Sequence, residues 1–461
     1  MFVGRKEELK ELKNKYNTDT TEVISVLGRR RVGKSQLIFH SYKDFDGLVI
    51  SYECSDTGYK DNLEGIEKLI KETLKNEYIH FNSLYDVMMF LQNEASKQKI
   101  LFIIDEYPYM REGKATDSMI KNAIDEFDKM DKKNPFKFVL CGSSVQVMEI
   151  LDNANMPLHG RFTKTIHLYP LNYLESSLFY KDASLEDKVK YYATIGGTPY
   201  FLNQIDPKLS FDENIVNIYF ADNALLKNEL DSQINGEINK IEKATYILNI
   251  IQDKMVSYSD INQIYKSRYK EGSIDYPVKK LIEMKVIEKI NVQQDNGKNK
   301  PYYRIIDNAI KFYYSYLIRS LANKNLFSNK DYYEKFIKED LNQHFIPLMF
   351  EGVGYQFIAL MNQHNKLDDT LYDLFTYVIN DKRTKNNYQF DVVGKSKKGL
   401  INFECKFKDV EVNKEEVEKE NRQAELANSN FYKTVFISKN KVDTNEKVYS
   451  LVDVYNYGLL D

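Results

Sequence analysis

Short apolar runs alternate with amphipathic stretches along residues 1–205. The apolar runs have the length and β-branched content of buried strands, and the stretches between them have helical spacing. Strands and helices in alternation predict an α/β fold with a parallel sheet. The expected strands are Val23–Leu27, Leu48–Tyr52, Ile100–Ile104, Phe136–Leu140 and Thr165–Leu168, and the expected helices include Asn62–Lys75, Ser83–Ala95 and Asp117–Met130.

From about residue 206 to residue 325 the pattern changes to short helices. They are expected at Ile215–Leu230, Ala244–Ile251, Tyr258–Tyr265 and Tyr276–Met284. Two extended runs follow, Val286–Val292 and Tyr302–Ile306, with the turn Asp295-Asn296-Gly297 between them. Because Asn-Gly between extended runs is a hairpin signal, three helices and a hairpin predict a winged helix-turn-helix.

The remaining residues, about 326–461, mix helices with strands. The expected order is a helix at Met349–Phe357, strands at Leu374–Ile379, Tyr388–Val393 and Leu400–Phe407, a charged helix at Lys414–Ala427 and a strand at Thr434–Ile437. We therefore divide the 461 residues into three domains, 1–205, 206–325 and 326–461. This division agrees with a prior of about 150 residues per domain.

Composition narrows the possible partners. A formal net charge of −3 predicts neither a general nucleic-acid binder nor a membrane-surface protein, so any basic site must be local. Cys54, Cys141 and Cys405 are widely separated, which argues against structural zinc and disulfides and favours a reducing, cytoplasmic setting. The chain has neither an apolar run of 18 residues nor a signal-peptide pattern, and we expect no membrane partner.

The strand at Val23–Leu27 runs directly into a glycine loop that fits the P-loop pattern G-x-x-x-x-G-K-[ST]. Gly28 and Gly33 let the backbone curl so that amide groups cradle phosphate oxygens, and the helix after the loop points its positive end at them. Lys34 then reaches the outer phosphates and the Ser35 hydroxyl ligates magnesium. The sequence therefore predicts binding of ATP with Mg²⁺. The loop residues assigned to ATP are Gly28, Arg29, Arg30, Arg31, Val32, Gly33, Lys34, Ser35 and Gln36.

Two acids follow the apolar run Ile100–Ile104, about seventy residues after the loop. Such a run delivers carboxylates to the edge of the sheet where ligands of α/β folds bind. We expect Asp105 to hold the metal and Glu106 to polarise the water that attacks the γ-phosphate. After the next strand, the position of Ser143 suits a sensor that hydrogen-bonds the γ-phosphate or the attacking water. The alternative is a plain turn in which Ser144 caps a helix, and both interpretations can hold at once.

Arg161 follows a Leu-His-Gly segment shortly before the last expected strand. An arginine here could complete the site as a finger, within one subunit or across two, by neutralising charge in the transition state. A surface salt bridge is the alternative.

In the C-terminal domain, Asp391 precedes Glu404 and Lys406 on neighbouring expected strands. Glu404 and Lys406 point to the same face of a strand, and a hairpin partner can place Asp391 beside them. In metal-assisted phosphodiester hydrolysis, two carboxylates can hold the divalent metal while a lysine positions the attacking water. The alternative is a solvated strand face with an ordinary Glu–Lys pair.

The expected winged helix carries lysines that could contact phosphates, but acids interleave with them and no arginine is placed for bidentate guanine reading. Contact with DNA and contact with protein therefore both stay open. The lysines are Lys279, Lys280, Lys285, Lys298 and Lys300, and the acids are Glu271, Asp275, Glu283 and Glu288.

The opening Phe2-Val3-Gly4-Arg5-Lys6-Glu7-Glu8-Leu9 resembles the first box of AAA+ and STAND-type ATPases. The segments LGRRRVGKS, FIIDE, CGSS, GRF and IGGTPY follow in the order of the archaeal-type ATPase family, which the chain resembles over its whole length. This resemblance implies that Val3 and Arg5 lie near the adenine. It also implies that Pro199 lies in or near the lid, and that the arginines at 29–31 are a family trait.

The C-terminal arrangement resembles the PD-(D/E)xK restriction-endonuclease-like fold, in which Glu351 would be the extra acid that many members use. The chain departs from its relatives in having no tryptophan and in placing Gln389 where an acid commonly precedes Asp391. The resemblance implies an ATP-driven switch that couples the ATPase to a nuclease-like module acting on DNA or RNA. The rival hypothesis is a slow, non-nuclease ATP switch whose C-terminal modules bind protein or DNA. A homo-oligomer or a partner protein is compatible with both.

Overall fold

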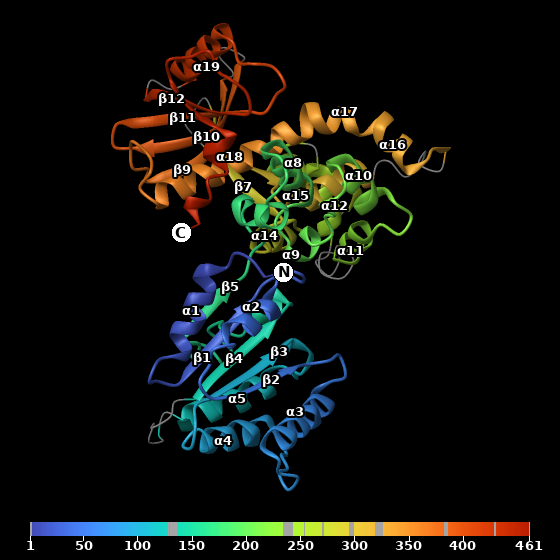
Figure 1. Ribbon diagram of the computed structural model, residues 1–461, viewed down its shortest axis with the longest axis vertical. Coiled ribbons are helices and arrows are strands. Elements are labelled where there is room, and N and C mark those ends of the chain that lie inside the picture. The colour runs from blue at the N-terminus through green and yellow to red at the C-terminus, as the bar shows by residue number, and fades with distance from the viewer. Residues whose placement is uncertain are drawn as a thin grey trace. The chain divides into compact units, whose positions relative to one another are not determined.

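The computed structural model describes residues 2–127, 129, 136–233, 243–252, 254–269, 272–294, 299–318, 326–381, 386–427 and 430–460. The chain separates into two compact units, Met1–Pro170 and Leu171–Asp461, which are described one at a time (Figure 1). The division into three domains stays a prediction. Within the described ranges, no helix combines the length and the apolar content needed to cross a bilayer.

The first unit is built on five parallel strands in the order β2-β3-β4-β1-β5, which confirms the predicted parallel sheet. β1, β3 and β4 are buried along their whole length, as expected for strands covered on both faces. The strands are β1 (Glu22–Leu27), β2 (Leu48–Glu53), β3 (Ile100–Asp105), β4 (Phe136–Gly142) and β5 (Lys164–His167).

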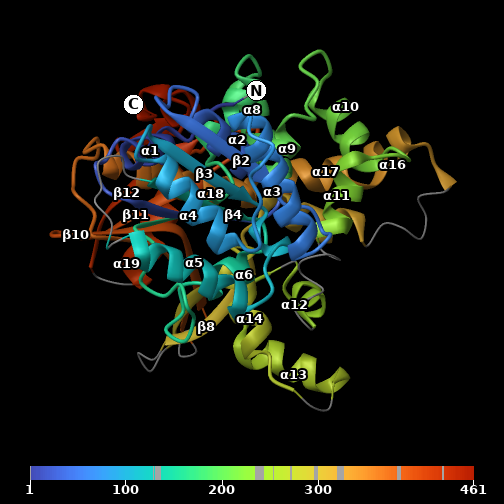
Figure 2. The same ribbon diagram turned by 90° about the horizontal axis from the view of Figure 1, so that it is seen from below.

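Helices cover both faces of this sheet and form a three-layer sandwich (Figures 1 and 2). Successive strand residues point to opposite faces, so Ile24 and Val26 pack with α1 and α2, whereas Val23 and Leu27 share a core with α3, α4 and α5. The helices are α1 (Lys6–Tyr16), α2 (Lys34–Ser41), α3 (Tyr59–Leu74), α4 (Leu84–Glu94), α5 (Lys114–Phe127) and α6 (Val145–Ile150), with a short 3₁₀ turn at Tyr107–Tyr109.

β4 lies between β1 and β3, and this order decides which side chains can meet. Leu27 is paired with Gly142, and Ile104 is paired with Leu140. The carboxyl ends of the three strands therefore open onto the same edge of the sheet. The glycine loop, the acids after β3 and the serines after β4 all begin there.

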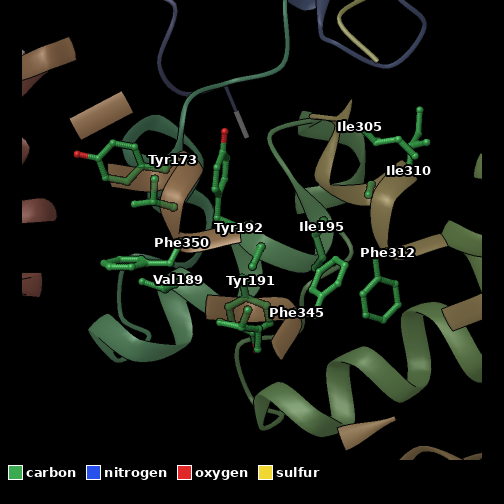
Figure 3. Close-up of a cluster of buried hydrophobic side chains, with 14 of the residues drawn as sticks. Tyr173, Val189, Tyr191, Tyr192, Ile195, Ile305, Ile310, Phe312, Phe345 and Phe350 are labelled. Carbon is green, nitrogen blue, oxygen red and sulfur yellow. The ribbon is translucent and has the colours of Figure 1, made fainter. Parts of the chain in front are cut away.

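The second unit begins with helices that pack into an aromatic-rich core (Figure 3). In α8, Tyr191, Tyr192 and Ile195 point into this core together with Phe312 and Phe345 from later in the chain. The elements are α7 (Tyr173–Ser176), α8 (Leu185–Ile195), α9 (Pro199–Leu202), α10 (Phe211–Ile215) and α11 (Leu225–Gln233), with a 3₁₀ turn at Ser177–Tyr180 and a π-helical turn at Val216–Phe220.

Three helices and a hairpin follow, which confirms the predicted winged helix-turn-helix. β7 and β8 are antiparallel, with Ile287 opposite Ile305, and β6 pairs with β8. The predicted turn at Asp295-Asn296-Gly297 lies outside the described residues. The elements are α12 (Ala244–Ile251), β6 (Val256–Ser257), α13 (Tyr258–Arg268), α14 (Asp275–Glu283), β7 (Ile287–Gln294) and β8 (Asn299–Ile305).

The C-terminal part has a helix, three antiparallel strands, a second helix and two further strands that are parallel to β11. This order of helices and strands is the predicted one, with β13 as an additional strand. The first helix is longer than predicted. The main elements are α18 (Ile346–Gln363), β9 (Asp373–Asp381), β10 (Asn386–Ser396), β11 (Gly399–Lys406), α19 (Lys414–Ala427), β12 (Phe431–Ser438), β13 (Lys447–Ser450) and α20 (Leu451–Val454).

Short helical segments connect the hairpin to α18. They are α15 (Asn308–Phe312), a π-helical turn at Tyr313–Leu317, α16 (Asn329–Phe336), α17 (Lys338–Asp340) and a second π-helical turn at Leu341–Phe345. A 3₁₀ turn at Tyr457–Leu459 follows α20.

The hairpin and the C-terminal strands form one sheet. β7 pairs in parallel with β9 at Gln293–Ile379 and Gln294–Asn380. The strand order is therefore β13-β12-β11-β10-β9-β7-β8-β6, a single eight-stranded sheet. No local sequence pattern predicts this junction, because it consists of two residue pairs between segments that are far apart in the chain.

Candidate functional site

The glycine loop between β1 and α2 has the close backbone approaches that its sequence implies. A Cβ at Gly28 would lie 2.3 Å from the Leu168 carbonyl oxygen, and Gly33 has a φ of +95°. The Lys34 ammonium is buried and donates to the carbonyl oxygens of Gly28 (2.9 Å) and Arg29 (3.1 Å). The lysine thus folds back over its own loop.

Ser35 and Asp105 meet at the edge of the sheet. The Ser35 hydroxyl donates to Asp105 Oδ2 at 2.6 Å, and Asp105 Oδ1 accepts from the Glu106 amide at 2.9 Å. The two residues are seventy positions apart, and the pairing of β1 and β3 with β4 brings them together. One hydroxyl and one carboxylate oxygen are hard donors that fit Mg²⁺ in kind.

Glu106 and Ser143 also lie in contact. Glu106 has a φ of +52°, and its Oε2 accepts from both the amide (3.0 Å) and the hydroxyl (2.7 Å) of Ser143. A left-handed backbone at a non-glycine residue costs free energy and is found mostly where neighbouring groups hold it. Ser144 precedes α6, but its side chain forms no capping hydrogen bond within the described chain.

Other predicted ATP-site residues frame the loop. Val3 is half-buried, and buried Arg5 donates to the carbonyl oxygens of Val32 (3.2 Å) and Tyr169, which ties the N-terminal segment to the loop. Arg30 donates to the Tyr109 hydroxyl at 2.8 Å, a partner that sequence reasoning missed. Arg31 has a φ of +69°. Gln36 is exposed on α2.

Arg161 and Pro199 are not part of this cluster of contacts. Arg161 Nε donates to Asp125 Oδ1 at 2.9 Å, and Lys121 pairs with the same carboxylate at 2.8 Å. Pro199 begins α9 in the second unit. Its predicted contact with the adenine stays a prediction.

A second cluster lies on β10, β11 and α18. The register of β10 shifts between Phe390 and Val393, and Asp391 within that bulge accepts from the Cys405 amide at 3.0 Å. Lys406 Nζ lies 2.8 Å from Glu404 Oε1 and 2.9 Å from Glu420 Oε1. Asp391, Glu404 and Lys406 therefore lie together, and Glu420 of α19 is a further charged member that no sequence motif marked.

Burial dominates the acid–base chemistry of this cluster. Burial, together with Glu351, raises the pKa of Asp391 to about 8. Burial and the neighbouring Asp391 raise the pKa of Glu404 to about 8, and burial raises the pKa of Glu351 to about 7 against the opposing effect of Arg304. Buried carboxylates raise one another's pKa values, and a nearby cation stabilises their charged form.

The carboxylate oxygens match a divalent metal in kind. In the described parts of the chain, however, no group of three or more His, Cys, Asp or Glu side chains is in position to hold an ion together. Lys406 is instead the cation that neutralises this cluster, and its pKa is raised by Glu404 and Glu420 against the lowering effect of burial.

Arg304 is a further residue that sequence reasoning missed. It extends from β8, where its Nε lies 2.6 Å from Glu288 Oε1. Its guanidinium also donates to Thr376 Oγ1 at 3.2 Å and lies 3.8 Å from Glu351 Oε2. No motif marked this arginine, because its partners come from three separate elements, β7, β9 and α18.

The lysines of the winged helix are partly neutralised. Lys279 and Lys280 both pair with Glu283, and Lys300 lies over the ring of Tyr302. Lys285, which has a φ of +55°, is exposed after α14. Lys298 and Glu271 lie outside the described residues. A basic face on this module is therefore modest, as the sequence indicated.

Comparison with known proteins gives two family matches. Residues 2–205 match a family described as an ATPase domain predominantly from Archaea, and residues 313–419 match one described as archaeal and bacterial proteins of unknown function. A protein of Methanocaldococcus jannaschii described as uncharacterized is 28% identical over 374 residues, covering 80% of this chain and 79% of the relative. An uncharacterized ATP-binding protein of the same organism is 26% identical over 64% of this chain and 87% of its own length.

Solved structures also align with the chain. The Walker-type ATPase of Pyrococcus abyssi covers 68% of this chain and 96% of its own, at 15% identity and a TM-score of 0.48. The Aeropyrum pernix ORC2 protein in ADPNP–ADP complexes covers 70% and 95%, at 15% identity and a TM-score of 0.49.

A parallel sheet whose first strand enters a GxxxxGKS loop, and in which the serine of that loop donates to an acid at the end of β3, defines a P-loop nucleoside triphosphatase. Residues 2–205, which contain this loop and sheet, match the family of ATPase domains found predominantly in Archaea, so this part of the chain is similar to archaeal P-loop ATPase domains.

Proposed function

We propose that the first unit binds ATP through the glycine loop and hydrolyses it at the edge of the sheet. The observation that carries this proposal is the convergence of Ser35 with Asp105 and of Glu106 with Ser143 at the ends of three adjacent strands. The relative from M. jannaschii that is described as ATP-binding supports the choice of nucleotide.

Each residue has a distinct role in this proposal. The loop amides and Lys34 bind the phosphates, and Lys34 exchanges its carbonyl partners for phosphate oxygens. Ser35 and Asp105 would hold Mg²⁺, which when bound neutralises phosphate charge. Glu106 orients and deprotonates the attacking water, and Ser143 fixes the Glu106 carboxylate.

Further residues complete the nucleotide site in this proposal. Val3 and Arg5 pack near the adenine, and Pro199 contacts the nucleotide from the lid. Arg161 neutralises charge that develops on the γ-phosphate, for which it must leave Asp125. If the Arg161–Asp125 pair is only a surface salt bridge, Arg161→Ala will leave ATP turnover unchanged.

ATP turnover by the purified full chain, with and without DNA, tests this proposal. Glu106→Gln keeps the shape of the side chain but removes the base, so we expect turnover to fall by roughly 10²–10⁴-fold while ATP binding persists. Full turnover in Glu106→Gln would remove Glu106 from the mechanism.

We further propose that the C-terminal module acts on nucleic acid with Asp391, Glu404 and Lys406, and that ATP binding controls it. The buried carboxylates of Asp391 and Glu404, whose pKa values are raised, support a metal site of two carboxylates, and a metal bound there would polarise a phosphodiester. Asp391 and Glu404 would hold the metal, Glu351 would assist, and Lys406 would position water.

A second function competes with this one. Lys406 is engaged by both Glu404 and Glu420, and Arg304 lies beside Glu351, so the cluster is already neutralised by protein cations. This observation favours a switch that turns ATP over slowly and whose C-terminal modules are scaffolds for protein or DNA. In either case a homo-oligomer or a partner protein could receive the signal.

Nicking assays separate the two functions. Wild-type protein is incubated with plasmid and single-stranded substrates in Mg²⁺ or Mn²⁺, with and without ATP. Asp391→Asn, which keeps the shape of the side chain, and Lys406→Ala should both abolish metal-dependent cleavage without changing ATP binding. Intact substrates under all conditions would leave only the scaffold function.

Contacts within the second unit support coupling between α8 and the C-terminal cluster. Gln356 of α18 accepts from the Tyr173 amide at 3.0 Å and donates to the Tyr192 hydroxyl at 3.0 Å. Gln356 lies on the same helix as Glu351. A shift of α8 would therefore move the helix that carries Glu351.

Three dispersed, unbridged cysteines agree with the proposed cytoplasmic setting.

A further inference from the structure

A cleft of about 920 Å³ lies within the second unit, between the hairpin and the C-terminal module. One wall is formed by residues of β7 and β8, and the other by residues of α18 and β9. Glu351 lines this cleft and also belongs to the carboxylate cluster around Asp391. Gln389, two residues before Asp391 on β10, lines it too. The cleft therefore borders the candidate nuclease site at Glu351.

The polar lining of the cleft is richer in cations than in acids. Glu288, Glu351 and Asp373 are the carboxylates on its surface. The cations are Lys254, Lys289, Arg304 and Lys311. Lys289 is exposed on β7 and forms no ion pair with any residue in the described parts of the chain. A local excess of positive charge on a chain with net charge −3 indicates an anionic ligand.

One acceptor in the cleft lacks a donor. Glu351 Oε2 is buried and has no hydrogen-bond partner among the described residues, since the Arg304 nitrogen lies 3.8 Å away. An unsatisfied buried carboxylate oxygen is costly. A ligand that carries N–H groups, such as the exocyclic amine of a nucleobase, would satisfy it.

Aromatic side chains give the same cleft stacking surfaces. Tyr355 lies one helical turn after Glu351 on α18, is 39% exposed, and donates its hydroxyl to the Leu374 carbonyl oxygen at 3.1 Å, which fixes the ring. Phe375 of β9 lines the cleft nearby. Aromatic rings beside cations are the combination that binds single-stranded nucleic acid.

The volume limits the size of the ligand. About 920 Å³ lies within the range of ~300–1,000 Å³ that holds a small-molecule ligand. A few nucleotides fit such a space, whereas a duplex does not.

We propose that this cleft binds a short segment of single-stranded nucleic acid and guides it toward Asp391, Glu404 and Lys406. Lys289 and Arg304 bind backbone phosphates, and Arg304 exchanges Glu288 for phosphate. Tyr355 stacks on a base, and Glu351 accepts from a base amine. This inference rests on the proposed action of the C-terminal module on nucleic acid, and a free nucleotide shares the same chemistry.

Binding is measured by fluorescence anisotropy with the full chain in EDTA, where no metal-dependent cleavage occurs. The probes are labelled ten-nucleotide DNA and RNA strands, the matching duplex, and an unlabelled 5′-phosphorylated dinucleotide as competitor. We expect both single strands to bind more tightly than the duplex. Competition by the dinucleotide at similar concentrations would assign the cleft to free nucleotides, and weak competition would assign it to longer strands. Each result supports the cleft.

Matched variants locate the binding. Lys289→Ala with Tyr355→Ala should weaken strand binding roughly tenfold or more, whereas Tyr355→Phe keeps the stacking ring and should bind as wild type does. Lys279→Ala with Tyr276→Ala removes a similar pair from α14, the helix that reads DNA in most winged helices, and should have little effect. Melting temperatures equal to that of wild type show that each variant is folded.

Three outcomes would overturn the proposal. They are tighter binding of the duplex, a loss confined to the α14 pair, and no binding of any probe by wild-type protein. Cleavage is scored separately, so its failure is distinguishable. Strand binding that depends on the cleft, without cleavage in Mg²⁺ or Mn²⁺, would defeat the nuclease proposal and leave the cleft in place. Metal-dependent cleavage that the cleft variants do not change would keep the nuclease proposal and defeat the cleft proposal.

Discussion

Ser143 holds the Glu106 carboxylate with two hydrogen bonds, one from its amide at 3.0 Å and one from its hydroxyl at 2.7 Å. The amide donates whatever the side chain is, so only the hydroxyl bond depends on residue identity. A hydrogen bond to a charged group contributes about 1.5–3 kcal/mol. These two hydrogen bonds therefore fix the position of the Glu106 carboxylate at the carboxyl end of β3.

Ser143→Ala should lower the rate of ATP hydrolysis by roughly 10- to 150-fold, the equivalent of one hydrogen bond to a charged group, with little change in ATP affinity. The reason is that Glu106 loses the donor that fixes it. Ser144→Ala is the matched control, since the adjacent serine forms no capping bond within the described chain, and it should change turnover less than twofold. Equal effects from both serines would contradict the assigned role of Ser143.

Lys34→Ala should remove the thermal stabilisation that ATP gives the protein. A ligand at a hundredfold excess over its Kd stabilises the folded state by about 2.7 kcal/mol, and the lysine supplies the charge that binds the outer phosphates. Melting with and without ATP and Mg²⁺ measures this shift. Lys43→Ala removes an exposed cation just beyond α2 and should leave the shift intact. An unchanged shift in Lys34→Ala would defeat the central assignment.

The carboxylate cluster should make the metal-free protein less stable as the pH rises from about 4 to about 8. Burial raises the pKa values of Asp391 and Glu404 to about 8 and that of Glu351 to about 7. Because the folded state then binds more protons than the unfolded chain, stability is complete below the ordinary pKa values and is lost as the pH passes through the raised ones. Melting of the second unit in EDTA across this range measures the slope.

Asp391→Asn is the control for this pH dependence. The amide does not titrate, so the slope of melting temperature against pH between 5 and 8 should flatten. Mn²⁺ should raise the melting temperature of wild type more at pH 8 than at pH 6, because the ligands must lose their protons to bind it. Stability that rises with pH in EDTA would contradict the burial of these carboxylates.

Gly197→Ala should destabilise the second unit by about 1–3 kcal/mol, the usual cost of overpacking. A Cβ at this position would lie 1.9 Å from the Leu171 carbonyl oxygen, so the backbone around α9 must move. Gly352→Ala is the control, since it lies within α18 with nothing within 4 Å and should be neutral or stabilising. Denaturant unfolding of both variants makes the comparison, and equal midpoints would show that the close approach at Gly197 is relieved without cost.

Local patterns were sufficient for much of the fold. The β-branched run before Gly28, the run before Asp105 and the pattern of three helices with a hairpin each reflect chemistry that is confined to neighbouring residues. The same holds for Glu404 and Lys406, whose spacing on one strand places both side chains on one face. These features survive in the structure because burial and backbone geometry act at short range.

Contacts between distant segments could not be predicted. Arg304 meets Glu351 and Thr376 only because β7 pairs with β9. Glu420 reaches Lys406 from α19, where the sequence shows only a run of charges. Arg161, which precedes β5, likewise meets Asp125 only because α5 packs close to that segment. In each case the partner is chosen by tertiary packing, which no local pattern records.

The aromatic face of α8 bears on how the chain can be dissected. The family match ends at residue 205, but Tyr191, Tyr192 and Ile195 are buried against residues from far beyond that point (Figure 3). A fragment that stops at 205 would leave this face uncovered, and the expected result is aggregation. A fragment that stops at Pro170 keeps the whole β2-β3-β4-β1-β5 sheet and its two helical layers. Proteolysis and expression of the isolated ATPase core should therefore favour the earlier boundary.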